Sequence, residues 1–236
     1  MLLVALTTGC IKEDLDSCDT NLIFRYFGDG TKDIFPEKIE KVDLYVYSEN
    51  GALVETIGLD QGDLRNNQGT PLNLPAGKYR VVGWGNTKNE TRINQAAALN
   101  TALVAAPHYF TKEIITTNDS LYIGSRDIEI FQDASSTDTV YFSSSHIKMY
   151  LELDGLEEMA MADGTSPIEI EVGNLSPTVD FVKTFSSENV SYKPVVQKEG
   201  NASGFKSRFN VLRFNNNNSI YINLVSKKTN KTIYTL

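Results

Sequence analysis

Apolar residues recur at every second position along much of this chain, and this period of two restricts the fold more than any other feature. Val42, Leu44 and Val46 alternate with other residues, and residues 168–172 (IEIEV) alternate without interruption. Successive side chains of a β-strand point to opposite faces, so the pattern predicts strands with one buried face. Further stretches predicted as strands are residues 53–57, 78–84, 139–142, 147–153, 209–214, 220–225 and 232–236.

Turn signals separate the predicted strands. Asn50-Gly51 follows the first strand and favours a tight hairpin, and residues 227–231 (KKTNK) join the last two strands. Many short strands with turns between them are typical of sandwiches and barrels. A seven-stranded sandwich takes about 100 residues, so the 236 residues predict an all-β fold with two β-sandwich domains, 21–135 and 136–236. Their expected limit lies in the polar stretch 132–138.

Helical signal is confined to one segment. Residues 94–106 are rich in Ala and Leu and precede Pro107. A proline cannot continue a helix, so we expect a short helix that ends before it. Residues expected in the core of the first domain are Val42, Leu44, Val46, Val81 and Trp84, and those of the second are Ile147, Met149, Leu151, Ile168, Ile170 and Val172.

The N-terminus reads as a processing signal. Residues 1–9 contain an apolar run and small residues before Cys10 but lack a basic start, so we expect Met1 to lie inside a longer signal peptide, of which 1–9 is a remnant. The run resembles a bacterial lipobox, which implies lipid attachment at Cys10. In the acidic leader, 10–20, Lys12, Glu13 and Asp14 resemble a surface-export signal of Bacteroidetes lipoproteins.

No pattern in the chain indicates catalysis. A phosphate-binding Gly-rich loop, a His-Glu-x-x-His pair and a Gly-x-Ser-x-Gly elbow are all absent from the sequence. The acidic leader lacks the spacing of a calcium loop, so we expect no catalytic residue, metal or cofactor. The net charge of -8 disfavours nucleic acid as a partner. Trp84 and Tyr79 could form a sugar platform, but their place inside a strand favours core packing.

Three segments carry a resemblance to a known family. Residues 10–18 (CIKEDLDSC), residues 42–51 (VDLYVYSENG) and residues 74–86 (LPAGKYRVVGWGN) are similar to the FimB/Mfa2 family of fimbrial anchor lipoproteins of Bacteroidetes. The resemblance implies two transthyretin-like Greek-key β-sandwich domains. It also implies a surface-exposed protein, not an enzyme, that is held in the outer membrane by its N-terminal lipid. The implied partners are fimbrial (pilin) subunits, bound by β-strand complementation.

Two expectations remain open from the sequence. A surface glycan-binding lipoprotein of a nutrient-uptake system is the alternative function, because such proteins share the leader and the β-sandwiches. The last predicted strand ends at Leu236, where members of the family continue. We therefore expect a chain cut short and an exposed, incompletely paired sheet edge in the second domain.

Overall fold

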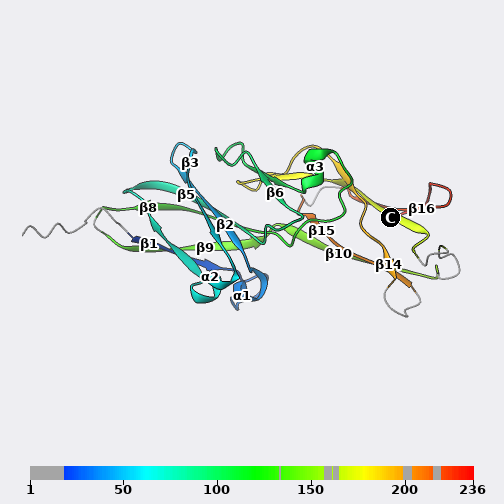
Figure 1. Cartoon of the computed structure of the whole chain (residues 1–236), viewed down its shortest axis with the longest axis horizontal. Helices are drawn as coiled ribbons and strands as arrows, with labels where there is room; N and C mark the ends of the chain where they lie inside the picture. The colour runs from blue at the N-terminus through cyan, green and yellow to red at the C-terminus, as the bar shows by residue number, and fades with distance from the viewer. Residues whose placement is uncertain (1–18, 133, 157–160, 162–164, 199–203, 215–218) are drawn as a thin grey trace, which may run out of the picture.

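The computed structural model describes residues 19–132, 134–156, 161, 165–198, 204–214 and 219–236. Its elements form an elongated molecule built almost entirely of strands (Figure 1). The N-terminal half contains β1 (Asp19–Arg25), α1 (Phe35–Lys38), β2 (Val42–Ser48), β3 (Leu53–Leu59), α2 (Gln61–Asn66), β4 (Gly69–Asn73), β5 (Gly77–Gly85), β6 (Arg92–Asn94), β7 (Leu103–Ala105), α3 (Pro107–Thr111), β8 (Tyr122–Ile130) and β9 (Ser136–Ser144). The C-terminal half contains β10 (His146–Asp154), β11 (Ile168–Leu175), β12 (Thr178–Asp180), β13 (Val190–Tyr192), β14 (Gln197–Lys198), β15 (Gly204–Leu212), β16 (Tyr221–Ser226) and β17 (Lys231–Thr235).

Seven strands of the N-terminal half form one sheet in the order β3-β2-β5-β8-β9-β1-β4. Most neighbours are antiparallel, but β1 runs parallel to β9 over six residue pairs, from Thr20↔Ser136 to Arg25↔Tyr141. Its other edge pairs with β4, antiparallel. The predicted hairpin is confirmed in β2 and β3, and Gly51 in its turn has φ of 81°, a conformation that glycine adopts without the steric cost of a side chain.

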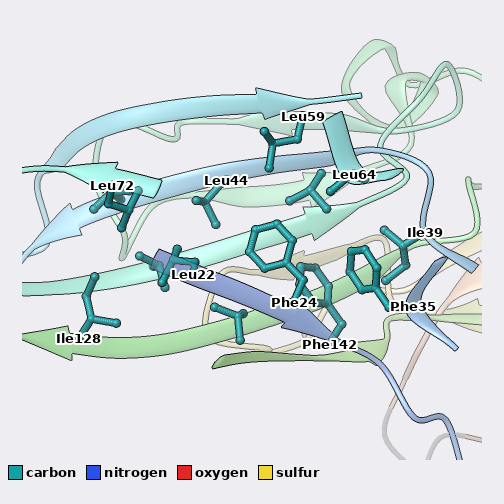
Figure 2. Packing of buried hydrophobic residues seen from close by; sticks show 14 of the residues in the cluster. Leu22, Phe24, Phe35, Ile39, Leu44, Leu59, Leu64, Leu72, Ile128 and Phe142 are labelled. Atoms are coloured by element: carbon teal, nitrogen blue, oxygen red, sulfur yellow. The ribbon is translucent and has the colours of Figure 1, made fainter. Parts of the chain in front are cut away.

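The alternating side chains of this sheet build the N-terminal core (Figure 2). Leu22 and Phe24 enter it from β1, and the Phe24 ring packs edge-to-face on Phe142 of β9 with ring centroids 5.5 Å apart. Gly83 and Gly124 lie opposite each other on β5 and β8. A Cβ atom at either position would lie 2.8 Å from Phe142 or Val140. The two glycines therefore give the Phe142 ring room to lie against the sheet.

Two further sheets form the C-terminal half. One has the order β10-β15-β14 and the other β13-β11-β16-β17. Ile170 and Val172 are buried between them, as the alternation in residues 168–172 predicted. The expected final hairpin is also confirmed, because β16 pairs antiparallel with β17.

A short three-stranded sheet, β12-β7-β6, joins the two halves. Beside β12, the side chain of Phe181 is buried against three aromatic rings of the seven-stranded sheet. Its ring centroid lies 5.1 Å from that of Tyr45, 6.1 Å from that of Tyr47 and 5.7 Å from that of Trp84. Burial of such a large apolar side chain is worth about 2 to 3 kcal/mol, so Phe181 holds the halves together.

The prediction of a helix in residues 94–106 is wrong. This stretch holds a turn and β7, and Pro107 begins α3 instead of ending a helix. Ala102 and Val104 are fully buried, and Val104 pairs with Val179 of β12. Strand pairing and burial therefore override the helical preference of the alanines, and proline fits the first turn of a helix, where no N–H partner is needed.

The division into domains 21–135 and 136–236 stays a proposal. β9 begins at Ser136 but pairs with β1 and β8 of the N-terminal half. Its hydrogen bonds favour a limit after Ser144, at the start of β10.

A partly buried carboxylate, that of Asp33, fixes the end of β1. Asp33 accepts hydrogen bonds from Arg25 Nη1 at 2.8 Å, from the backbone N–H groups of Tyr26 at 3.0 Å and Phe35 at 3.1 Å, and from Gln68 Nε2 at 2.8 Å. Partial burial by itself raises the pKa of Asp33, but these four donors together lower it to about 2. Charged hydrogen bonds of this kind favour the ionised form.

The lowered pKa of Asp33 predicts a specific acid sensitivity. Because the carboxyl binds protons more weakly when folded, its stabilisation is present above about pH 4 and is lost as the pH falls towards 2. The loss should be about 2 kcal/mol. Chemical unfolding of Asp33→Asn should show lower stability at pH 7 and a flatter dependence between pH 5 and pH 2. An unchanged pH profile in the variant would contradict this assignment.

Candidate functional site

The predicted lipid-attachment residue, Cys10, and the predicted export residues, Lys12, Glu13 and Asp14, lie outside the described residues. Their roles therefore stay predictions. Within the described part of the chain, no helix is long and apolar enough to span a membrane. No three His, Cys, Asp or Glu residues gather there in a way that could hold a metal ion.

One side of the C-terminal half has open strand edges. β13 and β14 follow each other in sequence, and each lies at the outer end of its own sheet. The opposite ends of the two sheets are β10 and β17. Because both sheets contribute to one core, we infer that these two strands lie on the same side. Among the described residues, β10 pairs with β15 and β17 with β16, and neither has a second neighbour. Within the residues that the structure describes, β10 and β17 are therefore edge strands.

The inner face of this side is apolar and partly uncovered. Directly opposed residues of an antiparallel pair share a face, so Tyr234 lies on the same face as Leu224, which packs on the core. Leu236 exchanges backbone hydrogen bonds with Ile222, at 2.9 and 3.0 Å, and shares that face too. Yet Tyr234 is 56% and Leu236 64% exposed. We refer to these two side chains and the half-buried apolar residues of β10 and β16 as the apolar edge: Ile147, Met149, Leu151, Leu153, Ile222, Leu224, Tyr234 and Leu236.

The outer face of the same sheet carries several polar side chains. Thr235 donates through its hydroxyl to Asn223 Oδ1 at 2.7 Å. Lys193 Nζ lies 2.8 Å from Glu169 Oε1, and the hydrogen bond to this carboxylate raises the pKa of Lys193. The contrast between the two faces means that an incoming chain would bury apolar side chains mainly on the inner face.

The backbone of β17 offers hydrogen-bonding groups on its free side. Because Ile222 and Leu236 form a hydrogen-bonded pair, the next such pair is Leu224 and Tyr234. Thr235 lies between them, so its N–H and C=O groups point away from β16. Such unpaired groups are a template for another strand.

The structure corrects the sequence-based picture of the second core. Ile168, Ile170 and Val172 are buried as predicted, but Ile147, Met149 and Leu151 are half-buried. Alternation shows which face of β10 is apolar, but not that β10 lies at the edge of its sheet. Trp84 is fully buried, so it packs in the core as expected and cannot form a sugar platform with Tyr79.

The chain matches one protein family by sequence and several solved structures by fold. A model of the family described as "Fimbrillin-A associated anchor proteins Mfa1 and Mfa2" matches residues 15–236. The solved fimbrial anchor protein Mfa2 from Porphyromonas gingivalis has a TM-score of 0.67 and 14% identity, over 93% of this chain and 82% of that chain. A candidate adhesin from Bacteroides ovatus has a TM-score of 0.75 and 18% identity, over 96% and 78%.

A candidate polysaccharide-binding protein from Bacteroides thetaiotaomicron has a TM-score of 0.75 and 15% identity, over 93% of this chain and 80% of that chain. At these identities the likeness to solved structures establishes a shared fold. No curated protein sequence matches the chain.

Because the apolar edge is exposed, we expect lysine substitutions there to have little effect on stability. Tyr234→Lys combined with Leu236→Lys should change the free energy of unfolding by no more than about 0.5 kcal/mol, because both side chains are largely exposed. The same variant should bind less of a hydrophobic fluorescent dye. Ile170→Lys, at a fully buried position, is the control and should unfold the protein. A large loss of stability in the double variant would show that the edge is covered in solution.

Proposed function

Because the chain belongs to the family of fimbrillin-A associated anchor proteins Mfa1 and Mfa2, we propose that it anchors a fimbria to the bacterial outer membrane. Membership gives the protein a fimbria-associated role at the cell envelope and places it in a class that is not an enzyme class. The match over residues 15–236 is the observation that carries the proposal.

The membrane end of the anchor is the N-terminal leader. In our proposal Cys10 carries the lipid, and Lys12, Glu13 and Asp14 direct the protein to the cell surface. Each buried CH2 group of an acyl chain contributes about 0.8 kcal/mol, and one chain alone binds a membrane only reversibly. Lipid attachment with more than one acyl chain would hold the protein durably in the outer membrane.

The fimbrial end is the apolar edge of the C-terminal half. A donor strand from a fimbrial subunit would pair with β17, where Thr235 presents free backbone groups, and would place alternate side chains on the apolar face. Main-chain hydrogen bonds then supply affinity and the side-chain contacts supply register. Supporting this assignment, Tyr234 and Leu236 are exposed on the face that elsewhere forms the core.

Glycan binding is less well supported. The platform suggested by the sequence is lost because Trp84 is buried. Another aromatic pair, Phe27 and Tyr141, has ring centroids 6.3 Å apart and a 34° angle between the rings. It lines an open hollow with Arg213. The tilt of the rings disfavours the flat, shared surface on which a sugar chain stacks.

The lipid anchor is tested by Cys10→Ala. The variant should remain soluble in the periplasm, because it has no acceptor for the lipid, whereas the natural protein should fractionate with the outer membrane. Cys18→Ala is the matched control and should stay with the membrane. Recovery of Cys10→Ala in the membrane fraction would mean that another feature holds the protein there.

Strand complementation is tested at Thr235 in the full natural chain. Thr235→Pro removes the outward N–H group but none of the backbone hydrogen bonds between β17 and β16. It should weaken binding of a fimbrial donor-strand peptide by about tenfold or more, the effect of losing about 1.4 kcal/mol. Thr235→Ala, the control, loses the hydroxyl but keeps the N–H group and should bind normally. Equal binding by all three proteins would rule out pairing at this edge.

A further inference from the structure

The strand that follows the leader runs along the axis on which a tethered anchor is pulled. β1 begins at Asp19, at the C-terminal end of the predicted leader. Its first residues pair with the start of β9, at Thr20↔Ser136, and β9 ends at Ser144, two residues before β10. The start of β1 and the C-terminal half therefore lie at opposite ends of the β1–β9 pair. Figure 1 shows the same arrangement, with β1 towards one end of the long axis and β10, β14 and β16 towards the other.

We propose that β1 is a mechanical clamp that bears the tension between the membrane and the fimbria. The proposal rests on the anchor function, because a protein held at its leader and loaded at its C-terminal half is pulled along this axis. Tension then draws β1 by its N-terminal end and β9 by its C-terminal end. Because the two strands are parallel, this force slides them past each other instead of separating them rung by rung.

Sliding loads many hydrogen bonds at once. The hydrogen bonds run from strand to strand, perpendicular in the antiparallel pair β1–β4 and slanted in the parallel pair β1–β9. A pull along the strands therefore strains all the bonds of a pair together. β1 has six paired residues with β9 and five with β4. Both ladders must fail before the strand can leave the sheet.

Side chains resist the same movement. Leu22 and Phe24 are buried in the N-terminal core, and the ring of Phe24 packs against Phe35, 5.8 Å away, as well as Phe142 (Figure 2). Beyond the last residue of β1, the Asp33 carboxylate binds Arg25 and the N–H group of Tyr26. Withdrawal of β1 towards the leader would pull these groups out of the core and away from that carboxylate.

The load also has a continuous path into β9. Ser145, between β9 and β10, donates its N–H to Leu121 O at 2.8 Å and accepts from the N–H of Arg213 at 2.9 Å. Asn118 N–H donates to Asn210 O of β15 at 2.9 Å. Together with buried Phe181, these bonds fix the C-terminal half to the end of the sheet, so tension there reaches β9.

Single-molecule force spectroscopy on the mature chain tests the clamp. One handle is attached at Cys10, with Cys18→Ser, and the second either at Thr229→Cys in the turn before β17 or at Asn73→Cys. The first axis shears β1. The second pulls apart Asp19 and Asn73, which are paired neighbours, and so opens β1 and β4 one rung at a time. The shear axis should need about twofold or more the rupture force of the second axis, because its rungs are loaded together.

A pair of core variants tests which strand bears the load. Leu22→Ala on β1 should lower the rupture force on the shear axis, whereas Leu59→Ala on the edge strand β3 should leave it nearly unchanged. The comparison of axes uses no destabilising substitution and decides the matter even if Leu22→Ala fails to fold. Equal forces on both axes, or extension of the C-terminal half before β1 moves, would overturn the proposal. Fimbrial subunits are not needed, so failure of the clamp and failure of strand complementation are separate results.

Discussion

Leu22 and Phe24 enter the N-terminal core from a strand whose two neighbours are far away in sequence. β1 fills the space between β9 and β4, and without it the seven-stranded sheet would be divided there. The aromatic packing of Phe24 with Phe35 and Phe142 depends on this position. The Asp33 carboxylate then ties the end of β1 to the loop before α1 and to Gln68 before β4. A single strand thus joins the leader to the N-terminal core.

The two halves are joined through packing as well as through the chain. Phe181 comes from the C-terminal half but is buried against Tyr45, Tyr47 and Trp84 of the N-terminal half. The Trp84 ring is therefore part of the contact between the halves and unavailable to a ligand. A joint of this kind suits the proposed transfer of force from one end of the molecule to the other, whereas a flexible linker would let the halves separate under load.

Local patterns in the sequence predicted much of the fold but little of its long-range pairing. The alternation in residues 42–47 and 168–172 and the turn at Asn50-Gly51 identified strands, because these signals depend on near neighbours. The parallel pairing of β1 with β9 was not predictable, since it joins residues more than 100 positions apart. β8 was missed because Gly124, Ser125, Arg126 and Asp127 interrupt its apolar alternation. The prediction of a helix at 94–106 was wrong because the burial of Ala102 and Val104 outweighed the local helix propensity of this segment.

The candidate site was also predictable only in part, because local patterns in the sequence do not specify the order of strands in a sheet. The final hairpin follows from the strand pattern, and the predicted leader residues follow from a resemblance in the sequence. That β10 shares the open side with β17 depends on the order of strands in two sheets, which no local pattern encodes. The exposed inner-face position of Tyr234 likewise depends on its register with Leu224.

Contact between the apolar edge and a fimbrial subunit is tested most directly by crosslinking in fimbriated cells. A photoreactive amino acid in place of Tyr234 would report on partners at this edge, and the same amino acid in place of Tyr141, 60% exposed in the N-terminal half, is the control. The anchor proposal predicts a covalent product with a fimbrial subunit from position 234 and none from position 141. No product from position 234, or the same product from both positions, would contradict it.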